Sequence, residues 1–569
     1  RFGQEVQGIQ ELGTTGRGEN MQIGTYIEKN VDHELSGNII DLCPVGALNN
    51  KPYRYSARSW EMMQQPLVGG HDCVGSNLFA HTLRGTVKRV VPRPNDAINE
   101  TWISDRDRFS YEGIYAEDRL TGPKIRVDGE WQDCDWQTAL AQAASLLREA
   151  GTGTSLAVSP QATLEEGWLL QRVAEGLGTA NIDHRLHRRD THDQAAEPVF
   201  PFLGMPIAQL DTLDAALVVG SHLRAEAPIL AHRMRKAVVG NAARVAFMDS
   251  TSRDYNFELL ANLAGGLCAE LLAVASAVAE MTGTTLDARM IDALPAATVR
   301  EDHKAVAQAL VEGEQSLILL GVAAASHARF SELRWLATQL SAMTGATLGY
   351  LSAGPNAAGL SLAGVLPHRG AAGVARTEPG QAVREFVTEP GAAVMLWHVD
   401  PAVDLAAFEG VKGALAKVPV IACTPYGSGG VLEVADVILP VGTYAESDGT
   451  FVNVEGLAQT WQAVAKPVGE AREGWKVLTV LGQALALAGF DYTNSAALTA
   501  EVLGAIDLST PDNRDYAGAT PRSVNGEDHP EVLMHRPLYE TDEIVRRARA
   551  LQLTEAGQTG QLTRSGDTE

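Results

Sequence analysis

From about residue 125 onward, short runs of consecutive apolar residues alternate with longer stretches that have a helical pattern. Most of the runs end in Gly, Ser, Asp or Pro, which is typical of strands that are buried on both faces. The longer stretches are rich in Ala and Leu. The expected strands cover 156–158, 215–219, 245–248, 317–320, 394–397, 418–423 and 436–439. The expected helices cover 136–150, 163–176, 230–239, 269–281, 329–343 and 475–487.

This alternation predicts a doubly wound α/β architecture, in which helices cover both faces of parallel sheets. Ligands of such folds bind at the carboxyl ends of the strands. We expect the α/β region to span residues 124–490 and a C-terminal extension to span residues 491–569. The extension is polar, and we expect its end, Gly557–Glu569, to be disordered.

Two smaller segments precede the α/β region. Residues 1–65 have no strong periodicity and contain many glycines, so we expect a loop-rich segment that no large apolar core holds together. Residues 66–123 indicate a small β-rich domain. The stretch from Gly85 to Val91 alternates between apolar and polar residues and stops at Pro92, as expected of one arm of a hairpin.

Size and charge narrow the class of protein. With 569 residues, of which 45% are apolar, the chain can form several domains with large cores. The formal net charge is −24, from 46 Lys and Arg against 70 Asp and Glu. Such a chain repels phosphates, which argues against nucleic-acid binding. No apolar run is long enough to span a bilayer, so we expect membrane association only through partner subunits.

The cysteines supply the first candidate chemistry. The chain contains five of them, at Cys43, Cys73, Cys134, Cys268 and Cys423. Their scatter argues against a disulfide framework, and a free Cys is most often a buried small side chain. Cys43 differs because Pro44 follows it, and a Cys-Pro with a small apolar turn is how ferredoxin-type chains place the last thiolate on a [4Fe–4S] cluster. One cysteine cannot hold a cluster, which needs four ligands.

Several stretches around Cys43 together resemble the large iron–sulfur subunit of respiratory NADH–quinone oxidoreductase (complex I), which in mitochondria is the 75-kDa subunit. These stretches are Arg1-Phe2, 11–18, 23–29, 35–48, 51–53 and 57–61. In this family a Cys-x2-Cys-x2-Cys run stands just before the Arg-Phe, and a Cys-Pro provides the fourth ligand. The resemblance implies that Cys43 is a [4Fe–4S] ligand, that its three partner cysteines lie upstream of Arg1, and that the chain is truncated at its N-terminus.

The α/β region resembles molybdopterin oxidoreductases, and residues 66–123 resemble the small domain that precedes it in those enzymes. The similarity lies in the stretches 219–221, 226–228, 435–440 and 446–456. Molybdenum enzymes commonly have an Arg after the Glu-Gly of the last stretch, where this chain has Leu457, so we expect no molybdenum. Some relatives bind a further four-Cys cluster near Cys73. Because this chain has no Cys-x2-Cys-x3-Cys there, we expect Cys73 to be structural.

The resemblance also implies a function. Electrons from NADH and a flavin in another subunit would pass through iron–sulfur clusters towards quinone, and the whole complex would couple this transfer to proton translocation. Further [2Fe–2S] and [4Fe–4S] clusters would lie upstream of Arg1. The partners would be the flavin- and NADH-binding subunits and the quinone-side subunits of the peripheral arm, at the cytoplasmic face of the bacterial inner membrane. No catalytic acid or base is expected in this chain.

Two alternatives to this function stay open. The first is a molybdopterin-dependent oxidoreductase of the formate dehydrogenase or nitrate reductase type, and the second is a scaffold subunit without a redox function. The stretch with His184, His187 and His192 is rich in Arg and Asp, and we interpret it as a solvated charged loop rather than a metal site. Asp41 is expected at the surface, or as a charge that tunes the potential of a cluster at Cys43.

Overall fold

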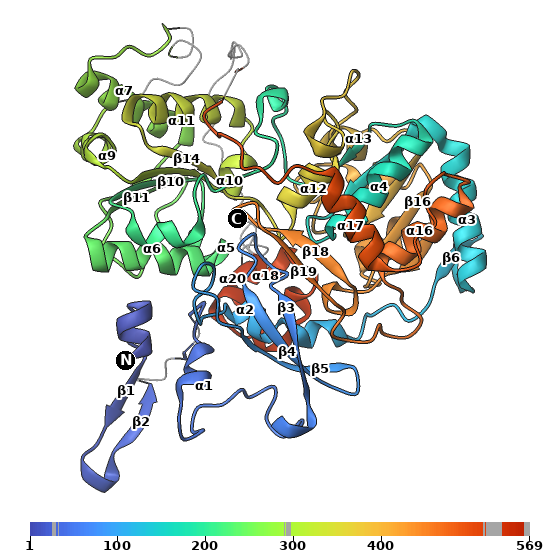
Figure 1. Cartoon of the computed structure of the whole chain (residues 1–569), viewed down its shortest axis with the longest axis horizontal. Coiled ribbons are helices and arrows are strands. Elements are labelled where there is room, and N and C mark those ends of the chain that lie inside the picture. Colours follow the sequence, from blue (N-terminus) through green and yellow to red (C-terminus); the bar gives the residue numbers. More distant parts are fainter. Residues whose placement is uncertain are drawn as a thin grey trace.

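The computed structural model describes residues 1–25, 30, 31, 33–288, 291, 298–515, 518 and 538–562. Two α/β units lie side by side, and a small antiparallel sheet lies below and between them in Figure 1. The N-terminal segment lies at the edge of the molecule, and its hairpin points away from both units. Among the helices that the structure describes, none is long and apolar enough to cross a membrane.

The larger sheet has seven strands in the order β7-β6-β17-β16-β15-β8-β9. The five strands from β17 to β9 are parallel, whereas β6 pairs with β17 and β7 pairs with β6 in the antiparallel direction. The strands are β6 (Lys124–Val127), β7 (Glu130–Asp133), β8 (Thr154–Val158), β9 (Ile182–Asp183), β15 (Ala393–Trp397), β16 (Val420–Thr424) and β17 (Val437–Pro440). The sheet is therefore mixed, and the parallel arrangement that the sequence predicts holds from β17 to the edge strand β9.

Helices cover both faces of this sheet. In β15, Met395 and Trp397 pack into one layer, while Val394 and Leu396 pack into the other, so every position of the strand is buried. This explains the continuous apolar run in the sequence. The first layer contains α3 (Trp136–Ala150), α4 (Leu164–Leu177) and α16 (Gly474–Ala484). The second contains α13 (Val383–Thr388), α14 (Val411–Leu415) and α15 (Gly429–Val434).

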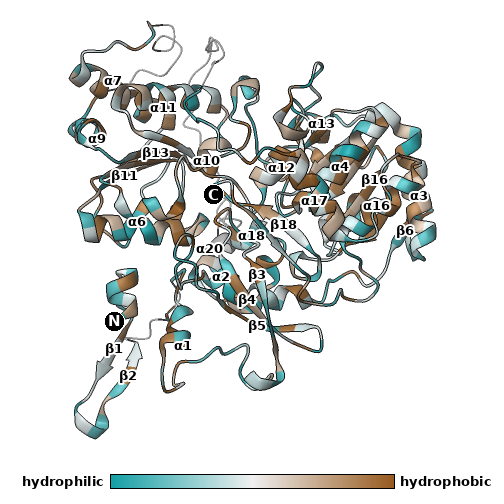
Figure 2. Cartoon of the chain, in the orientation of Figure 1, coloured by the Kyte–Doolittle hydropathy of each residue, from teal (hydrophilic) through white to brown (hydrophobic). Residues whose placement is uncertain are grey.

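The smaller sheet is parallel throughout, in the order β12-β11-β10-β13-β14. Its strands are β10 (Ala215–Val219), β11 (Arg244–Asp249), β12 (Ala261–Ala264), β13 (Ser316–Leu320) and β14 (Thr347–Tyr350). The covering helices are α6 (Pro228–Asn241) on one face, and α7 (Leu267–Thr282), α9 (Glu301–Glu312) and α11 (Phe330–Thr344) on the other. Figure 2 shows the hydrophobic strands between helices whose outer faces are hydrophilic.

The predicted doubly wound α/β architecture is confirmed. The helix expected at 136–150 is α3, and it begins after Asp135, whose side chain accepts a hydrogen bond from the Thr138 N–H. Each expected strand and helix is present with bounds that differ by at most a few residues. Several described strands of this region are not among the expected ones: β6, β7, β9, β12, β14, β18 and β19. Of these, β9 has only two residues, and the burial of β12 alternates instead of being continuous.

The small sheet consists of β3 (Met63–Val68), β4 (Asn77–Leu83) and β5 (Thr86–Pro92). The expected hairpin arm is β5, which pairs with β4 in the antiparallel direction. Arg84 and Gly85 form the turn, both with positive φ angles. A second hairpin, β18 (Gly449–Val452) and β19 (Ala458–Trp461), lies beside β3 and joins this module to the larger sheet.

The N-terminal segment has little regular structure. It contains a π-helical turn at Phe2–Gln7, a hairpin of β1 (Leu12–Thr15) and β2 (Gln22–Thr25), and the short helix α1 (Asn38–Leu42). Residues 26–29, which belong to one of the stretches that resemble complex I, lie outside the described residues. Phe2 and Leu35 reach the apolar layer under α6, which ties the segment to the smaller sheet.

The end of the chain returns to the body of the protein. Helix α17 (Ser495–Ala505) packs on α4 and β18 through Leu498 and Val502, so residues after 490 complete the core of the larger sheet. Residues 538–562 form α18 (Leu538–Thr541), α19 (Arg549–Gln552) and α20 (Glu555–Leu562). The expected disorder of Gly557–Glu569 is wrong for Gly557–Leu562, which are helical, while residues 563–569 lie outside the described residues.

Candidate metal centre

Cys43 follows α1 directly and caps its C-terminal end. The turn after it contains Gly46, whose φ of 65° favours glycine. This turn brings the Leu48 backbone nitrogen to 3.3 Å from the Cys43 Sγ. The N–H of Leu48, together with those of Val45, Ala47 and Gly46, lowers the pKa of the Cys43 thiol, because hydrogen bonds to the thiolate stabilise the charged form. The turn can therefore present a thiolate to a metal.

Helix α2 (Asp105–Phe109) fixes the beginning of α1. The Asp105 carboxylate accepts hydrogen bonds from the Ser36 hydroxyl at 2.6 Å and from the Gly37 N–H at 2.7 Å. Asn38 donates to the Ile103 carbonyl at 2.8 Å and accepts from the Ile103 N–H at 3.1 Å. Burial raises the pKa of Asp105 to about 6 despite these donors. These contacts fix the start of α1 and therefore the position of Cys43 at its end.

The surface near Cys43 is apolar and open. Cys43 is partly exposed, and its neighbours Leu42 and Val45 are 51% and 81% exposed. Tyr55 and Trp60, later in the same segment, are 92% and 77% exposed. Exposed large apolar side chains are typical of surfaces at which proteins make contacts.

Cys73 has the opposite environment. It is buried, and burial raises the pKa of its thiol to about 12, although Ser352 donates hydrogen bonds to it. The neighbouring His71 is bound on both ring nitrogens, by Asp542 at 2.8 Å and by Ser110 at 2.7 Å. Within the described ranges, no group of three or more His, Cys, Asp or Glu side chains could hold a metal ion. Cys73 is a neutral, structural thiol in this arrangement.

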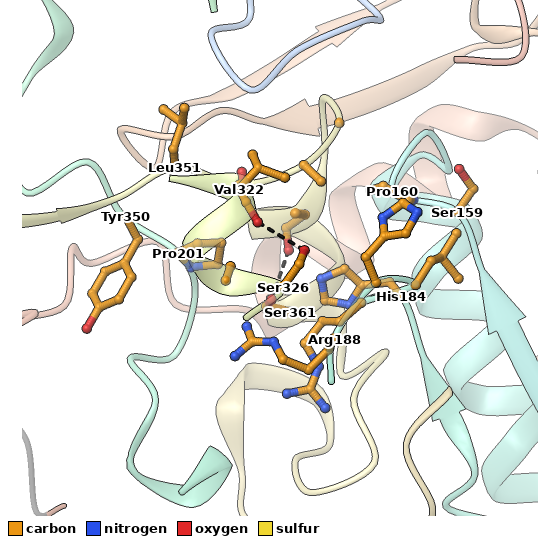
Figure 3. Close-up of a pocket in the computed structure, with 18 of the residues that line it drawn as sticks. Ser159, Pro160, His184, Arg188, Pro201, Val322, Ser326, Tyr350, Leu351 and Ser361 are labelled. Carbon is orange, nitrogen blue, oxygen red and sulfur yellow. Dashed lines mark hydrogen bonds between the residues drawn. The ribbon is translucent and has the colours of Figure 1, made fainter. Parts of the chain in front are cut away.

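A cavity of about 170 Å³ lies where the carboxyl ends of strands from both sheets meet. Ser159 and Pro160 follow β8, His184 follows β9, and Val322 follows β13. Figure 3 shows Ser326 and Ser361 next to each other in its wall, with His184 and Arg188 beside them. Leu538, Thr541 and Asp542 of the C-terminal segment also line it. The cavity is at the position that the fold predicts for a ligand.

The cationic side chains at this cavity are already bound to carboxylates of the chain. Arg185 pairs with Asp183 at 2.9 Å and Arg188 with Glu197 at 2.7 Å. Burial opposes ionisation of Glu197, yet the guanidinium groups of Arg188, Arg334 and Arg185 hold its pKa well below the usual range. These buried pairs leave the cavity without a cluster of uncommitted positive charge.

The expectation of a solvated loop is wrong for His184 and its acidic neighbours, whereas His192 is exposed. His184 is buried, and its Nδ1 lies 2.9 Å from the Val365 carbonyl oxygen. Asp183, Asp190 and Asp193 from the same stretch are buried as well. The charged residues face one another and the neighbouring helix α11 inside the protein, which a sequence pattern of Arg and Asp cannot distinguish from a surface loop.

One of the stretches that resemble molybdopterin enzymes, residues 446–456, makes internal contacts. Glu446 is fully buried and binds Arg119 at 2.9 Å. Asn453 donates to the Val74 carbonyl at 3.0 Å and accepts from the Leu457 N–H at 2.9 Å. The side chain of Leu457 is itself 45% exposed. These residues hold the hairpin β18–β19 against the loop that contains Cys73.

Comparison with protein families decides the class of the α/β region. The family model described as molybdopterin oxidoreductase matches residues 119–484, which is more than half of the chain. The chain belongs to the molybdopterin oxidoreductase family. Two further family models match this member: the NADH-quinone oxidoreductase subunit 3 ferredoxin-like domain at residues 1–49, and the NADH-ubiquinone oxidoreductase NDSU1/NuoG-like 4Fe-4S domain at residues 67–112.

Curated relatives confirm the resemblance to the large iron–sulfur subunit of complex I. The 78-kDa subunit of NADH-ubiquinone oxidoreductase from Candida albicans is 31% identical over 85% of this chain and 61% of the relative. The iron–sulfur protein 1 of NADH dehydrogenase from Solanum tuberosum is 30% identical over 88% and 62%. The 75-kDa subunit from Reclinomonas americana is 27% identical over 85% and 66%. The chain therefore spans less than two thirds of the length of these relatives.

A solved structure supports the fold of this family member. Acetylene hydratase from Pelobacter acetylenicus superimposes with a TM-score of 0.55 over 75% of this chain and 70% of that protein, at 13% identity. This similarity shows a shared fold and nothing about the reaction.

The fold family implies a molybdopterin dinucleotide, and the cleft does not fit one. The cavity of about 170 Å³ is smaller than the roughly 300–1,000 Å³ of ordinary ligand pockets. Its arginines are bound to Asp183, Glu197 and Asp193, so none is uncommitted for the phosphates of the dinucleotide. The C-terminal segment supplies part of its wall. The function of this chain is therefore sought at another site, without a pterin.

The sequence pattern identifies Cys43 but not the residues that hold it. Asp105 and Arg108 belong to a stretch that resembles the family, yet their contacts with α1 join positions about seventy residues apart. One signal was present, because Asp105-Arg106-Asp107-Arg108 alternates in charge. Asp542, which binds His71, has no local signal.

Proposed function

We propose that this chain is part of the large iron–sulfur subunit of NADH–quinone oxidoreductase. In this role it carries electrons that come from NADH and a flavin in another subunit towards quinone, and the whole complex couples the transfer to proton translocation. The observation that supports this most strongly is the Cys43 turn, in which the Leu48 N–H lies 3.3 Å from the Sγ and backbone N–H groups of the turn lower the pKa of the thiol. The turn lies within the match to the ferredoxin-like domain of the same enzyme.

The cluster would bind at Cys43, and its other three ligands would come from cysteines outside residues 1–569. When bound, a [4Fe–4S] cluster supplies one-electron transfer. The residues of this chain would favour its ligand thiolate by lowering the pKa of Cys43, and would orient the turn through α1 and α2. N–H donors to a cluster sulfur also stabilise the reduced, more negative state and so raise the potential.

The proposal extends to the other clusters of the subunit, to its partner subunits and to its location. Further [2Fe–2S] and [4Fe–4S] clusters would lie in the part of the subunit that precedes residue 1. The partners would be the flavin- and NADH-binding subunits and the quinone-side subunits of the peripheral arm. The exposed apolar side chains near Cys43 support a contact of this kind. The complex would place the chain peripherally at the cytoplasmic face of the bacterial inner membrane.

Replacement of Cys43 tests the proposal in membranes that contain the full-length subunit. Cys43→Ala removes one cluster ligand, so NADH-driven quinone reduction is expected to fall to background at an unchanged amount of assembled subunit. Cys134→Ser is the matched control, because Cys134 is also partly exposed but lies after β7 in the larger sheet unit. Wild-type rates in Cys43→Ala would contradict the proposal.

A further inference from the structure

Helix α2 contains four consecutive charged residues that are all buried. Asp105, Arg106, Asp107 and Arg108 are each at most 3% exposed. Burial of an ionised side chain costs several kcal/mol unless a partner compensates for it. Because successive residues of a helix point in different directions, the four side chains reach different neighbours. A helix of five residues with this composition is a junction between parts of the molecule.

The contacts of α2 connect the Cys43 segment with the rest of the protein. Arg106 binds Asp72 at 3.0 Å and the carbonyl oxygens of Ala225 at 2.6 Å and Glu226 at 2.9 Å, beside the smaller sheet. On the other side of the helix, Asp105 binds Ser36 and Gly37 just before α1. Helix α2 therefore binds both the smaller sheet unit and the residues before α1, and so fixes where α1 lies relative to that unit.

Among the contacts of α2 with the Cys43 segment, those of Arg108 reach the residue nearest to Cys43 in the sequence. Its Nη2 donates to Asn38 Oδ1 at 3.2 Å and to Asp41 Oδ2 at 2.5 Å. Both partners are on α1, and Asp41 is two positions before Cys43. The Arg108 side chain is 1% exposed and that of Asp41 is 36% exposed, so the guanidinium is buried while its carboxylate partner reaches solvent.

The close packing at Gly37 shows how tightly Arg108 lies against the segment. A Cβ atom at Gly37 would be only 2.5 Å from the Arg108 Cδ and 2.9 Å from Asp105 Oδ1. Only glycine fits at this position without displacing one of the two side chains. The sequence Ser36-Gly37-Asn38 is therefore matched to α2, and the Arg108 side chain packs directly against the residue before α1.

We propose that Arg108 is a positioning residue for the cluster ligand Cys43, and that the Arg108–Asp41 pair sets the charge beside the cluster. This inference rests on the proposed function. A buried positive charge near a cluster stabilises the reduced state, which carries one more negative charge, and so raises the reduction potential. The negative charge of Asp41 offsets part of this effect. Because Asp41 is the more exposed partner, salt screens its charge more strongly, and the offset is incomplete.

Opposite shifts of the midpoint potential test this proposal. The experiment uses the assembled complex with the full-length subunit and follows the [4Fe–4S] signal by potentiometric EPR titration. Asp41→Asn leaves the charge of Arg108 unbalanced, so the potential is expected to rise. Arg108→Gln leaves the charge of Asp41, so the potential is expected to fall. Arg108→Lys keeps the charge, and its potential is expected to stay near that of the wild type.

Asp133→Asn is the control for loss of a negative charge elsewhere. Asp133 pairs with Lys124 at 2.5 Å in the β6–β7 hairpin, which lies on the opposite side of the molecule from α1. No shift is expected there. If Arg108→Gln fails to assemble, Asp41→Asn and Arg108→Lys decide: an upward shift in the first with none in the second supports the proposal.

The outcomes separate this proposal from the proposed function. Equal potentials in Asp41→Asn and the wild type, or shifts of the same sign in Asp41→Asn and Arg108→Gln, would overturn the role of the Arg108–Asp41 pair. If Cys43→Ala, measured in parallel, keeps every cluster signal, the ligand assignment itself fails. Loss of one signal in Cys43→Ala with unchanged potentials in the other variants refutes only the inference about Arg108.

Discussion

At the scale of single residues, the two cysteines that the sequence places near possible clusters have opposite environments. N–H donors surround the partly exposed Cys43 and lower its pKa, whereas burial raises the pKa of Cys73. The Cys-Pro pattern predicts the first environment, because the turn that follows it is local. Nothing near Cys73 predicts the second, since Ser352 and Asn453 approach it from distant parts of the chain.

His71 illustrates what a residue-level pattern cannot show. Next to a cysteine it invites a metal hypothesis, but it is fully buried between Asp542 and Ser110. Burial opposes protonation of His71, yet the charge of Asp542 raises its pKa, and His71 in turn lowers the pKa of Asp542 against the effect of burial. Both shifts favour the ionised pair, and the pair contributes to stability.

Replacement of His71 is expected to destabilise the protein at neutral pH. His71→Gln leaves Asp542 buried and unpaired, which costs about 3–5 kcal/mol. Because the folded-state pKa of His71 is raised, the contribution of the ion pair is complete below the unfolded value of about 6.5 and is lost as pH rises through the higher folded value. Thermal unfolding should show a difference between wild type and variant that shrinks from pH 7 to pH 9. A difference that grows with pH would refute this assignment.

At the scale of secondary-structure elements, local pattern and burial agree for the central strands. Runs such as 215–219 and 394–397 are apolar at every position because helices cover both faces. Helix α2 is the opposite case. Four consecutive charges indicate a surface, yet all four are buried. Asp105, Arg106 and Arg108 bind residues from distant parts of the chain, and Asp107 accepts a hydrogen bond from the nearby Ser104. The local sequence pattern therefore predicts the strands of the two sheets, but it does not predict that the charged helix α2 is buried at a junction.

The C-terminal segment, residues 538–562, is a second element that the sequence does not reveal. Asp542 binds His71 in the small module, and Glu543 binds His398 beside the larger sheet at 3.0 Å. Tyr539, Val545 and Leu551 form a small apolar cluster around Phe109 of α2. The segment thus joins α2, the small module and the larger sheet.

Truncation at residue 537 is expected to loosen this junction. Each large apolar side chain that is lost contributes about 1.5–3 kcal/mol, and the two histidines lose their partners. The melting temperature should fall, and a dye that binds apolar surface should bind more strongly. Truncation after Leu562 is the matched control, because it keeps every described contact of the segment. Equal melting temperatures of both truncations would show that the segment contributes nothing to stability.

At the scale of the whole molecule, the two sheets point their carboxyl ends at one cleft, as their topology predicts. The sequence could not show that Arg334 pairs with Asp193 or that the C-terminal segment lines the cleft, because these contacts join residues more than a hundred positions apart. The fold is thus that of a molybdopterin oxidoreductase, while the redox site that we propose lies in the N-terminal segment, at Cys43.

The most direct test of the role of Cys43 is low-temperature EPR of the reduced, intact complex with the full-length subunit carrying Cys43→Ala. We expect one [4Fe–4S] signal to disappear or change its type, because that cluster has lost one of its four thiolates, while the other cluster signals keep their shape and intensity. A spectrum identical to that of the wild type would contradict the assignment of Cys43 as a cluster ligand.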